Sequence, residues 1–447
     1  MVKKTCEYDM EKMTIPNINY TLRHNLCLGC GICQSACPSN AINITIKQGR
    51  FIPQVDEIKC KNKKGCHRCT DVCPGLGIDL NRIAKENFTD IGIQTDHILG
   101  RYLKCFTGYS NDYDIRYHCA SGGMVSQFLI FLLEKKYIDG AIVTAFDPQN
   151  ELLVRSYIAH NRKEVLQAKS SKYAPVSLHG MAQAIKKETG TKYIIVGLPC
   201  HIHGFRKLAE IDYKLREKLI GYFAIYCSSG RTFYLTEHVF KERNIHKEDL
   251  TYFAYRDEGC LGSLVAQQRC GVRTNNSDTT CGKNKIYKEH YQSYYHPLRS
   301  FFIPRRCLFC IDHYGELGDV CFGDIHIEPY IEDKIGINSL VVRKKIWLDL
   351  LMEAKADGYI TLNNIISETL KQSQKMAYKK KERNGQFINL NKSLGYVVPQ
   401  YDVDYLKKPT IKTIFDYLQN RCQQFLGLHK SLWWLVSILK KDTSKLK

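Results

Sequence analysis

The feature that most constrains this chain is a run of four cysteines closed by a proline. The segment C-L-G-C-G-I-C-Q-S-A-C-P has the spacing C-x2-C-x2-C-x3-C-P, which is the bacterial spacing for [4Fe–4S] ligation. Its cysteines are Cys27, Cys30, Cys33 and Cys37. A second run, also closed by a proline, contains Cys60, Cys66, Cys69 and Cys73. Two such runs close together predict a one-electron relay.

The spacing also predicts how the eight cysteines divide between two cubane clusters. Three cysteines of a run bind one cluster, and the fourth binds the other cluster in two-cluster ferredoxins. We therefore expect the first cluster, cluster I, to be held by Cys27, Cys30, Cys33 and Cys73. Cluster II is then held by Cys60, Cys66, Cys69 and Cys37. Zinc, which also binds four thiolates, is the alternative, but zinc sites usually use C-x-x-C pairs.

The second run departs from the pattern between its first two cysteines. Five residues, Lys-Asn-Lys-Lys-Gly, separate Cys60 from Cys66 where the pattern has two. We interpret them as a looped-out insertion. Among the eight predicted ligands, Cys60 is therefore the one whose spacing departs from the pattern.

Composition limits the classes of protein to which this chain can belong. Its 447 residues predict two to four domains. Twenty cysteines with no apolar run near the start indicate metal binding in a reducing, anaerobic cytoplasm rather than disulfides. The net charge of +20 fits attraction to an acidic electron carrier, an anionic cofactor or an anionic membrane surface. The lysines and arginines are scattered without a nucleic-acid motif, so we expect no nucleic acid partner.

The pattern of residue types along the chain predicts three parts. Residues 19–85 form an α+β ferredoxin domain with two [4Fe–4S] clusters. Residues 100–345 alternate helix and strand signals, which predicts an α/β domain with a mixed sheet. Residues 346–447 are expected to form a helical, basic extension, in which residues 366–385 form an exposed lysine-rich helix.

Strands of the α/β part place further cysteines together. We expect strands over 139–145, 192–197 and 219–226, and helices over 124–135 and 181–187. Cys200 and Cys227 each follow one of these strands, and the carboxyl ends of strands are where α/β sheets bind ligands. Cys307 and Cys310 supply a C-x-x-C pair. These four thiolates suit a third cubane.

Two short motifs have both a structural and a functional interpretation. Ser121, Gly122 and Gly123 precede the apolar helix, where free amides suit a phosphate, although a plain helix cap has the same sequence. Lys172 and Tyr173 offer a cation and an aromatic ring that suit a dinucleotide cofactor. His201 and His203 are candidate proton donors by position only, and buried structural histidines are the alternative.

Taken in order, these pieces resemble the coenzyme F420 hydrogenase/dehydrogenase beta-subunit family. The matching segments are A-S-G-G-M, S-K-Y-A-P, G-L-P-C-H-I-H-G, G-Y-F-A-I-Y-C, Y-R-D-E-G and R-R-C-L-F-C-I-D-H-Y-G-E-L-G-D-V-C-F-G-D. They extend over about residues 100–345, and many members of the family carry a fused two-cluster ferredoxin. The resemblance implies a [4Fe–4S] cluster on Cys200, Cys227, Cys307 and Cys310 beside FAD. It also implies FAD contacts from Ser121, Gly122, Gly123, Lys172 and Tyr173.

The expected function is that of an iron–sulfur flavoprotein oxidoreductase. Electrons from a redox protein such as ferredoxin would reach FAD through the clusters and reduce a small-molecule acceptor, F420 or another, and the flow can also run in reverse. The alternative is an electron-transfer subunit that serves a partner enzyme and has no substrate of its own. The oligomeric state is open.

The end of the chain mixes apolar and basic residues. Residues 410–447 include Trp433-Trp434-Leu435-Val436 followed by lysines. The run is too short to span a bilayer. An amphipathic helix on the inner membrane surface and a helix docked on the protein are the two interpretations, and we favour docking slightly.

Overall fold

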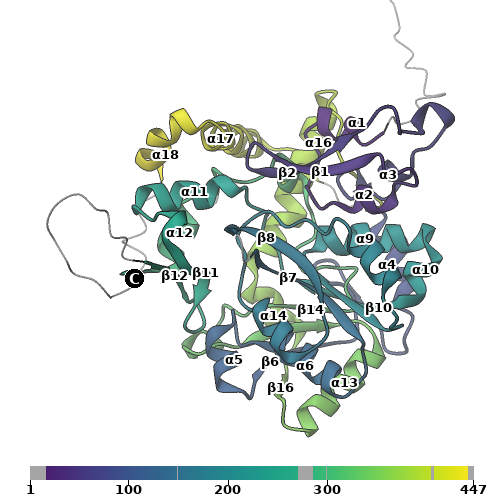
Figure 1. Ribbon diagram of the computed structural model, residues 1–447, viewed down its shortest axis with the longest axis vertical. Coiled ribbons are helices and arrows are strands. Elements are labelled where there is room, and N and C mark those ends of the chain that lie inside the picture. Colours follow the sequence, from purple (N-terminus) through teal and green to yellow (C-terminus); the bar gives the residue numbers. More distant parts are fainter. Residues whose placement is uncertain (1–16, 148–149, 270–284, 299, 404–406, 441–447) are drawn as a thin grey trace, which may run out of the picture.

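The centre of the protein is an eight-stranded mixed sheet, seen in a computed structural model that describes residues 17–147, 150–269, 285–298, 300–403 and 407–440 (Figure 1). The strand order is β16-β6-β15-β14-β10-β9-β7-β8. The inner strands β14, β10, β9 and β7 are parallel, and the flanking pairs are antiparallel. The strands are β6 (Lys104–Ser110), β7 (Gly140–Asp147), β8 (Asn150–Ala159), β9 (Tyr193–Gly197), β10 (Leu219–Ile225), β14 (Val320–Asp324), β15 (Asn338–Val342) and β16 (Ile360–Asn364).

Alternating side chains of the inner strands enter two different cores. Ile194 and Phe223 belong to one buried cluster, and their neighbours Ile195 and Tyr222 belong to the other. Because side chains of a strand point to opposite faces in turn, the sheet is covered on both sides. One face carries α4 (Leu80–Asn87), α8 (Met181–Lys187), α9 (Pro199–Ile211) and α10 (Tyr213–Lys218); the other carries α6 (Met124–Glu134) and α13 (Lys345–Ala356).

The N-terminal module is built from two short halves that pack on each other. Its elements are α1 (Asn19–Arg23), α2 (Ile32–Ala36), β1 (Ile42–Lys47), β2 (Arg50–Val55), η1 (Asn62–Lys64), α3 (Arg68–Asp71) and β3 (Gly77–Ile78). β1 and β2 form an antiparallel hairpin. Ile18 and Ile42 are buried with Cys33, Cys69 and Cys73 in a small core of their own. Cysteines therefore form much of this core, as expected when clusters replace apolar packing.

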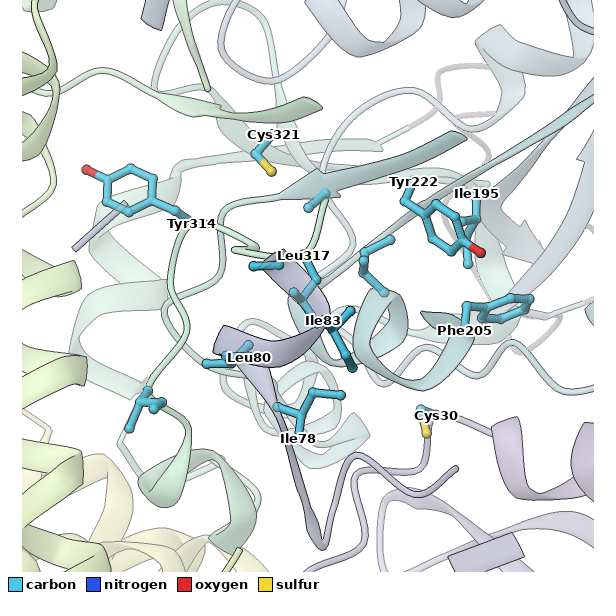
Figure 2. Close-up of a cluster of buried hydrophobic side chains, with 14 of the residues drawn as sticks. Cys30, Ile78, Leu80, Ile83, Ile195, Phe205, Tyr222, Tyr314, Leu317 and Cys321 are labelled. Carbon is cyan, nitrogen blue, oxygen red and sulfur yellow. The ribbon is translucent and has the colours of Figure 1, made fainter. Parts of the chain in front are cut away.

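The module shares a second, larger core with the α/β body. Cys30 and α4 belong to the same buried cluster as Phe205 of α9 and Tyr222 of β10, as Figure 2 shows. Gly204 leaves no room for a side chain, since a Cβ there would lie 2.7 Å from Ile32 Cγ1. The amide of Leu178 donates to the carbonyl of Cys30 at 2.9 Å. These contacts fix the module against the sheet.

A smaller sheet and the end of the chain form the third cluster of packed side chains. The sheet contains β11 (Leu250–Asp257), β12 (Ser263–Gln268) and β13 (Lys285–His290) in antiparallel order, with α11 (Phe233–Glu242) and α12 (Tyr291–Leu298) beside it. Leu426 of α17 (Ile411–Leu428) and Trp433 and Val436 of α18 (Trp433–Leu439) are buried in this cluster. The remaining elements are short: β4 (Gln94–Asp96), β5 (Gly100–Tyr102), α5 (Tyr113–His118), α7 (Arg162–Gln167), η2 (Lys247–Asp249), η3 (Arg305–Phe309), η4 (Tyr330–Glu332), β17 (Gln400–Tyr401) and η6 (Lys430–Leu432).

The part of the chain after residue 345 differs from the expected extension. It is not purely helical, because β16 joins the main sheet beside β6. The stretch 366–385 was predicted to be exposed, and this was wrong. It forms α14 (Ser367–Ser373), α15 (Lys375–Lys379) and the π-helix η5 (Lys380–Asn384), followed by α16 (Gly385–Ser393). Lys380 and Lys381 are 1% and 2% exposed, because they face carbonyl and carboxylate oxygens inside the protein.

The described part of the tail is docked rather than free. Trp433 is buried against Tyr234, His238 and Phe302, whereas the neighbouring Trp434 is 60% exposed. Residues 441–447 of the expected basic tail lie outside the described residues. None of the described helices has both the length and the apolar character needed to cross a membrane.

Candidate iron–sulfur and flavin site

The structure brings together the cysteines predicted for cluster I. Burial and then the nearby Cys73 raise the pKa of the Cys27 thiol to about 11. Burial and then Cys73 raise the pKa of Cys30 as well. Cys33 has both Cys27 and Cys73 among its electrostatic neighbours. Such thiols do not ionise readily by themselves, so a set of buried cysteines fits a group that supplies iron cations to stabilise the thiolates.

The cysteines predicted for cluster II also lie together, Cys60 included. Burial raises the pKa of Cys69 to about 11, and the neighbours that add to the shift are Cys37, Cys66 and Cys60. The five-residue insertion folds into η1, so it bulges out without moving Cys60 away from the set. Cys37 of the first run therefore lies beside Cys69 of the second run.

A third set of cysteines gathers where two parallel strands end. Cys200 lies in the first turn of α9, directly after β9, and Cys227 follows the adjacent strand β10. Cys307 lies in η3 and Cys310 directly follows it. All four line one cavity. Burial raises the pKa of Cys227 to about 12, and Cys307 and Cys310 are among the neighbours that add to the shift.

Cluster I lies next to this third set. After burial and Cys227, the next neighbour that raises the pKa of Cys200 is Cys30. Arg306, adjacent to Cys307, donates to the carbonyls of Pro74 and Gly75 at 2.9 and 2.7 Å. These carbonyls directly follow Cys73. The arginine therefore fixes the third set against the turn that closes cluster I.

Lys380 is a buried cation that sequence reasoning missed. Its Nζ donates to the carbonyl of Cys227 at 2.9 Å and to the carbonyl of Asp312. Although burial opposes a charge there, Cys310, Cys227 and Asp312 raise the pKa of Lys380 above its usual range. Lys380 therefore places a positive charge beside the third set. The lysine-rich composition of 366–385 was its only signal in the sequence.

The described part of the chain contains no group of three or more His, Cys, Asp or Glu side chains arranged to hold a single metal ion. A cubane presents iron at four separate corners, so its thiolates stand further apart than those around one ion.

The predicted FAD residues lie in two different environments. Ser121, Gly122 and Gly123 all have positive φ, and a Cβ on Gly122 would lie 2.8 Å from the carbonyl of Gly336. Asn338 Oδ1 accepts from the first amide of α6, that of Met124, at 3.1 Å. The two glycines therefore have a structural reason, which is a close approach of backbone, and part of the helix end is already capped.

Lys172 and Tyr173 point to different partners. Lys172 Nζ donates to the carbonyls of Ala168, Lys169 and Ser170 at 2.6, 2.5 and 3.1 Å, which lie at and just after the C-cap of α7. Burial lowers the pKa of Lys172 to about 7. Tyr173 instead packs against Tyr295, with ring centroids 4.2 Å apart.

Tyr173 belongs to a wall of aromatic and arginine side chains near the third set. Arg231, which lines the cavity of the third set, donates to Tyr295 Oη at 2.7 Å and lies over that ring. Arg256 stacks over Tyr291 and pairs with Asp324 at 3.0 Å. The residues after Tyr173, at positions 174–176, line the same cavity as the cysteines. Flat, cation-rimmed surfaces of this kind suit an aromatic, anionic cofactor.

Both candidate histidines are buried and have hydrogen-bond partners. The amide of Leu198 donates to His201 Nδ1 at 3.2 Å, so His201 Nε2 carries the proton and faces the Val176 carbonyl at 3.3 Å. Burial lowers the pKa of His201 to about 4. His203 Nε2 lies 2.8 Å from Asp312 Oδ2. These contacts match the structural interpretation of both residues.

Three stretches of the chain match models of known families. The family model for the C-terminal part of the coenzyme F420 hydrogenase/dehydrogenase beta subunit matches residues 190–368. The corresponding N-terminal model matches residues 105–183, and a 4Fe-4S dicluster domain matches residues 26–75.

Individual relatives carry related names. A coenzyme F420 hydrogenase subunit beta from Methanosarcina barkeri is 22% identical over 67% of this chain and 96% of its own length. A coenzyme F420-dependent sulfite reductase from Methanocaldococcus jannaschii is 30% identical over 45% of this chain, which spans 28% of that longer protein.

A solved structure has a similar fold. It is a chain of the F420-reducing [NiFe] hydrogenase complex from Methanosarcina barkeri, with a TM-score of 0.52, 18% identity, and coverage of 68% of this chain and 96% of that chain. The two beta-subunit models together match more than half of the chain, and the dicluster domain precedes them. The chain therefore belongs to the coenzyme F420 hydrogenase/dehydrogenase beta-subunit family and carries an N-terminal 4Fe-4S dicluster domain.

Proposed function

We propose that this chain is an iron–sulfur flavoprotein oxidoreductase that passes electrons between a redox protein, three [4Fe–4S] clusters and FAD, and so exchanges reducing equivalents with a small-molecule acceptor such as F420. The observation that carries the proposal is the adjacency of Cys30 and Cys200. It links cluster I to the third cysteine set, and electron transfer needs such short steps.

The proposed ligands of the clusters are the three sets described above. The residues that would hold FAD are Tyr173 with its aromatic neighbours, the S-G-G turn at 121–123 and Lys172. A bound flavin would supply two-electron chemistry next to one-electron carriers. The contribution of the chain is to bury the thiolates, exclude water and place Lys380 and Arg306 where they offset negative charge.

The proposed partners follow from the same architecture. An acidic redox protein such as ferredoxin would exchange electrons with cluster II, in an anaerobic cytoplasm. The exposed apolar side chains of the tail, Phe415, Phe425 and Trp434 among them, would give peripheral contact with the inner membrane surface. Vesicle sedimentation of wild-type protein and a Trp434→Ser variant tests that contact.

Metal and flavin analysis tests the core of the proposal. Anaerobically purified protein should contain about twelve iron and about twelve sulfide per chain, which is three cubanes of four, and extractable FAD. A Cys307→Ser, Cys310→Ser variant should lose about a third of the iron, whereas Cys422→Ser, at an exposed cysteine, should lose none. Full iron content in the double variant would refute the third site.

A second experiment separates a complete reductase from an electron-transfer subunit. The protein is reduced once and mixed with F420 or other small acceptors, or with candidate partner proteins. Reoxidation by a small molecule alone supports the reductase. Reoxidation only by a protein supports the subunit role, which the similarity to hydrogenase subunits favours.

A further inference from the structure

The insertion in the second cysteine run lies on the surface beside the ligands of cluster II. Its segment, 61–65, forms the single turn η1 and ends at Gly65 with a φ of 82°. The amide of Cys66 donates to the carbonyl of Lys61 at 3.3 Å, and Asn62 Nδ2 donates to the carbonyl of Cys66 at 3.1 Å. The start of the loop is thus tied to Cys66, a proposed cluster ligand that follows its end.

The side chains of this loop form a basic patch. We define the basic patch as five exposed residues: Lys59, Lys61, Lys63, Lys64 and Arg68. Within the described residues, the side chains of Lys61, Lys63 and Lys64 have neither a hydrogen bond nor an ion pair, and Lys59 pairs only with Asp56. These charges are therefore available to a partner.

One apolar side chain accompanies the lysines. Ile58 is 97% exposed and directly precedes the basic patch. This isoleucine is not buried by the fold, and it lies beside lysines without ion pairs. Transient protein interfaces combine such an apolar contact with charges that attract the partner.

The charge of the cluster explains why the lysines are useful there. A [4Fe–4S] cluster on four thiolates carries net negative charge, and so does an acidic electron carrier, so the two repel each other as they approach. Lysines in front of the cluster reverse that local field and steer the carrier to the surface where the electron path is shortest. A solvated patch elsewhere on the molecule has no such effect.

We propose that the basic patch with Ile58 is the docking surface for an acidic one-electron carrier protein, and that the insertion between Cys60 and Cys66 exists to provide it. This rests on the proposed function for the presence of cluster II. It adds the site and the charge class of the partner. The electron transferred leaves the reduced carrier and reduces cluster II by one electron, with no bond made or broken.

Stopped-flow reduction of the full-length holoprotein tests the proposal. The probe is an acidic two-cluster ferredoxin, reduced beforehand, at low ionic strength. Reversing three charges in Lys61→Glu, Lys63→Glu, Lys64→Glu should lower the second-order rate constant at least about tenfold, and the corresponding glutamine variant should lie between. The difference should largely vanish near 1 M salt, where the Debye length is about 3 Å.

Matched controls keep the two proposals apart. A Lys355→Glu, Lys375→Glu, Lys392→Glu variant carries the same change in net charge on exposed lysines of other elements and should react like wild type. Dithionite should reduce all variants to the same extent. Protein without clusters would instead refute the proposed function itself.

Two results would overturn the docking surface. One is an equal loss of rate in both triple variants, which would assign the effect to net charge. The other is an unchanged rate with the ferredoxin while the patch variant loses binding to phosphatidylglycerol vesicles or to duplex DNA, which would assign the patch to a different partner.

Discussion

Single buried charges set the electrical environment of the proposed third cluster. Lys380 lies 1% exposed beside Cys227 and Cys310, and Asp312 lies 0% exposed next to it. An isolated buried cation is costly, so its persistence needs anionic partners. Four thiolates and their cluster would supply them. The lysine is thus most simply understood as a counter-charge of the cluster.

Removing that charge should change a reduction potential. In Lys380→Met the reduced, more negative state of the third cluster loses its nearby cation, so the potential should fall. A charge pair about 4 Å apart in an effective dielectric of about 20 interacts by about 4 kcal/mol, so a drop on the order of 100 mV is expected. A redox titration followed by electron paramagnetic resonance measures it. Lys379→Met, at an exposed neighbouring lysine, should leave the potential unchanged.

The outcome also distinguishes a counter-charge from a packing role. If Lys380→Met loses iron but the remaining third cluster titrates at the wild-type potential, the lysine acts only through stability, and the electrostatic explanation is wrong. An Arg at this position keeps the charge and should retain the wild-type potential.

The positions of strands were easier to predict than the surroundings of individual side chains. The strands behind Cys200 and Cys227 follow from apolar runs that end in small or polar residues, and adjacent parallel strands then place both cysteines at one sheet edge. The environment of Lys380 could not be predicted in this way, because a lysine-rich stretch is normally solvated. Only the tertiary structure shows that its helix turns inward at η5.

The short motifs illustrate the same limit. Gly122 was expected to expose amides for a phosphate, but its nearest neighbour is the carbonyl of Gly336, from a segment more than two hundred residues away. Lys172 was expected to contact a cofactor, and its Nζ also donates to three backbone carbonyls at and just after the C-cap of α7. The local sequence singled out these residues, but it did not show which groups they contact in the fold.

The docked tail offers a direct test at the scale of one helix. Trp433→Ala should remove the side chain that α18 buries against Tyr234 and Phe302, with a loss of about 3–5 kcal/mol that falls mainly on the docking of the tail. Limited proteolysis should then cleave within residues 407–440 much faster. Trp434→Ala changes the same residue type at an exposed position and should behave like wild type.

The attachment of this helix should also depend on pH. Ser437 Oγ and Lys440 Nζ donate to the Glu242 carboxylate at 2.6 and 2.8 Å. Burial alone would raise the pKa of Glu242, but the nearby His238 ring and the hydrogen bonds from Lys440 and Ser437 hold it well below its usual range. The charged form is therefore favoured in the docked state, and its stabilisation is complete above the usual glutamate pKa of about 4.3 and is lost as pH falls below that value.

Proteolysis across pH, with an acid-tolerant protease, checks this. Protection of the tail should be constant between pH 7 and 5 and weaken below about pH 4.3. Glu242→Gln should weaken docking already at pH 7 and flatten the profile. A profile identical to wild type in that variant would contradict the assignment.

At the scale of the whole molecule, the ferredoxin module and the α/β body pack together as one unit. They share a continuous buried cluster that includes Cys30, Ile83 and Phe205. Arg306 ties the third cysteine set to the turn after Cys73. If a flexible linker alone joined the module to the body, the distance between the proposed clusters would vary. The observed packing instead fixes that distance.

A fixed, short distance predicts magnetic coupling between cluster I and the third cluster. In the fully reduced protein both are paramagnetic, so their signals should be broadened and split rather than a simple sum of two independent spectra. Cys307→Ser, Cys310→Ser should remove the third cluster and leave sharp, uncoupled signals from the ferredoxin module. Gly204→Leu, which crowds Ile32 at the contact between module and body, should weaken the coupling while all iron is retained. Additive spectra in the wild-type protein would show that Cys30 and Cys200 do not belong to neighbouring clusters, and the relay would have to take another path.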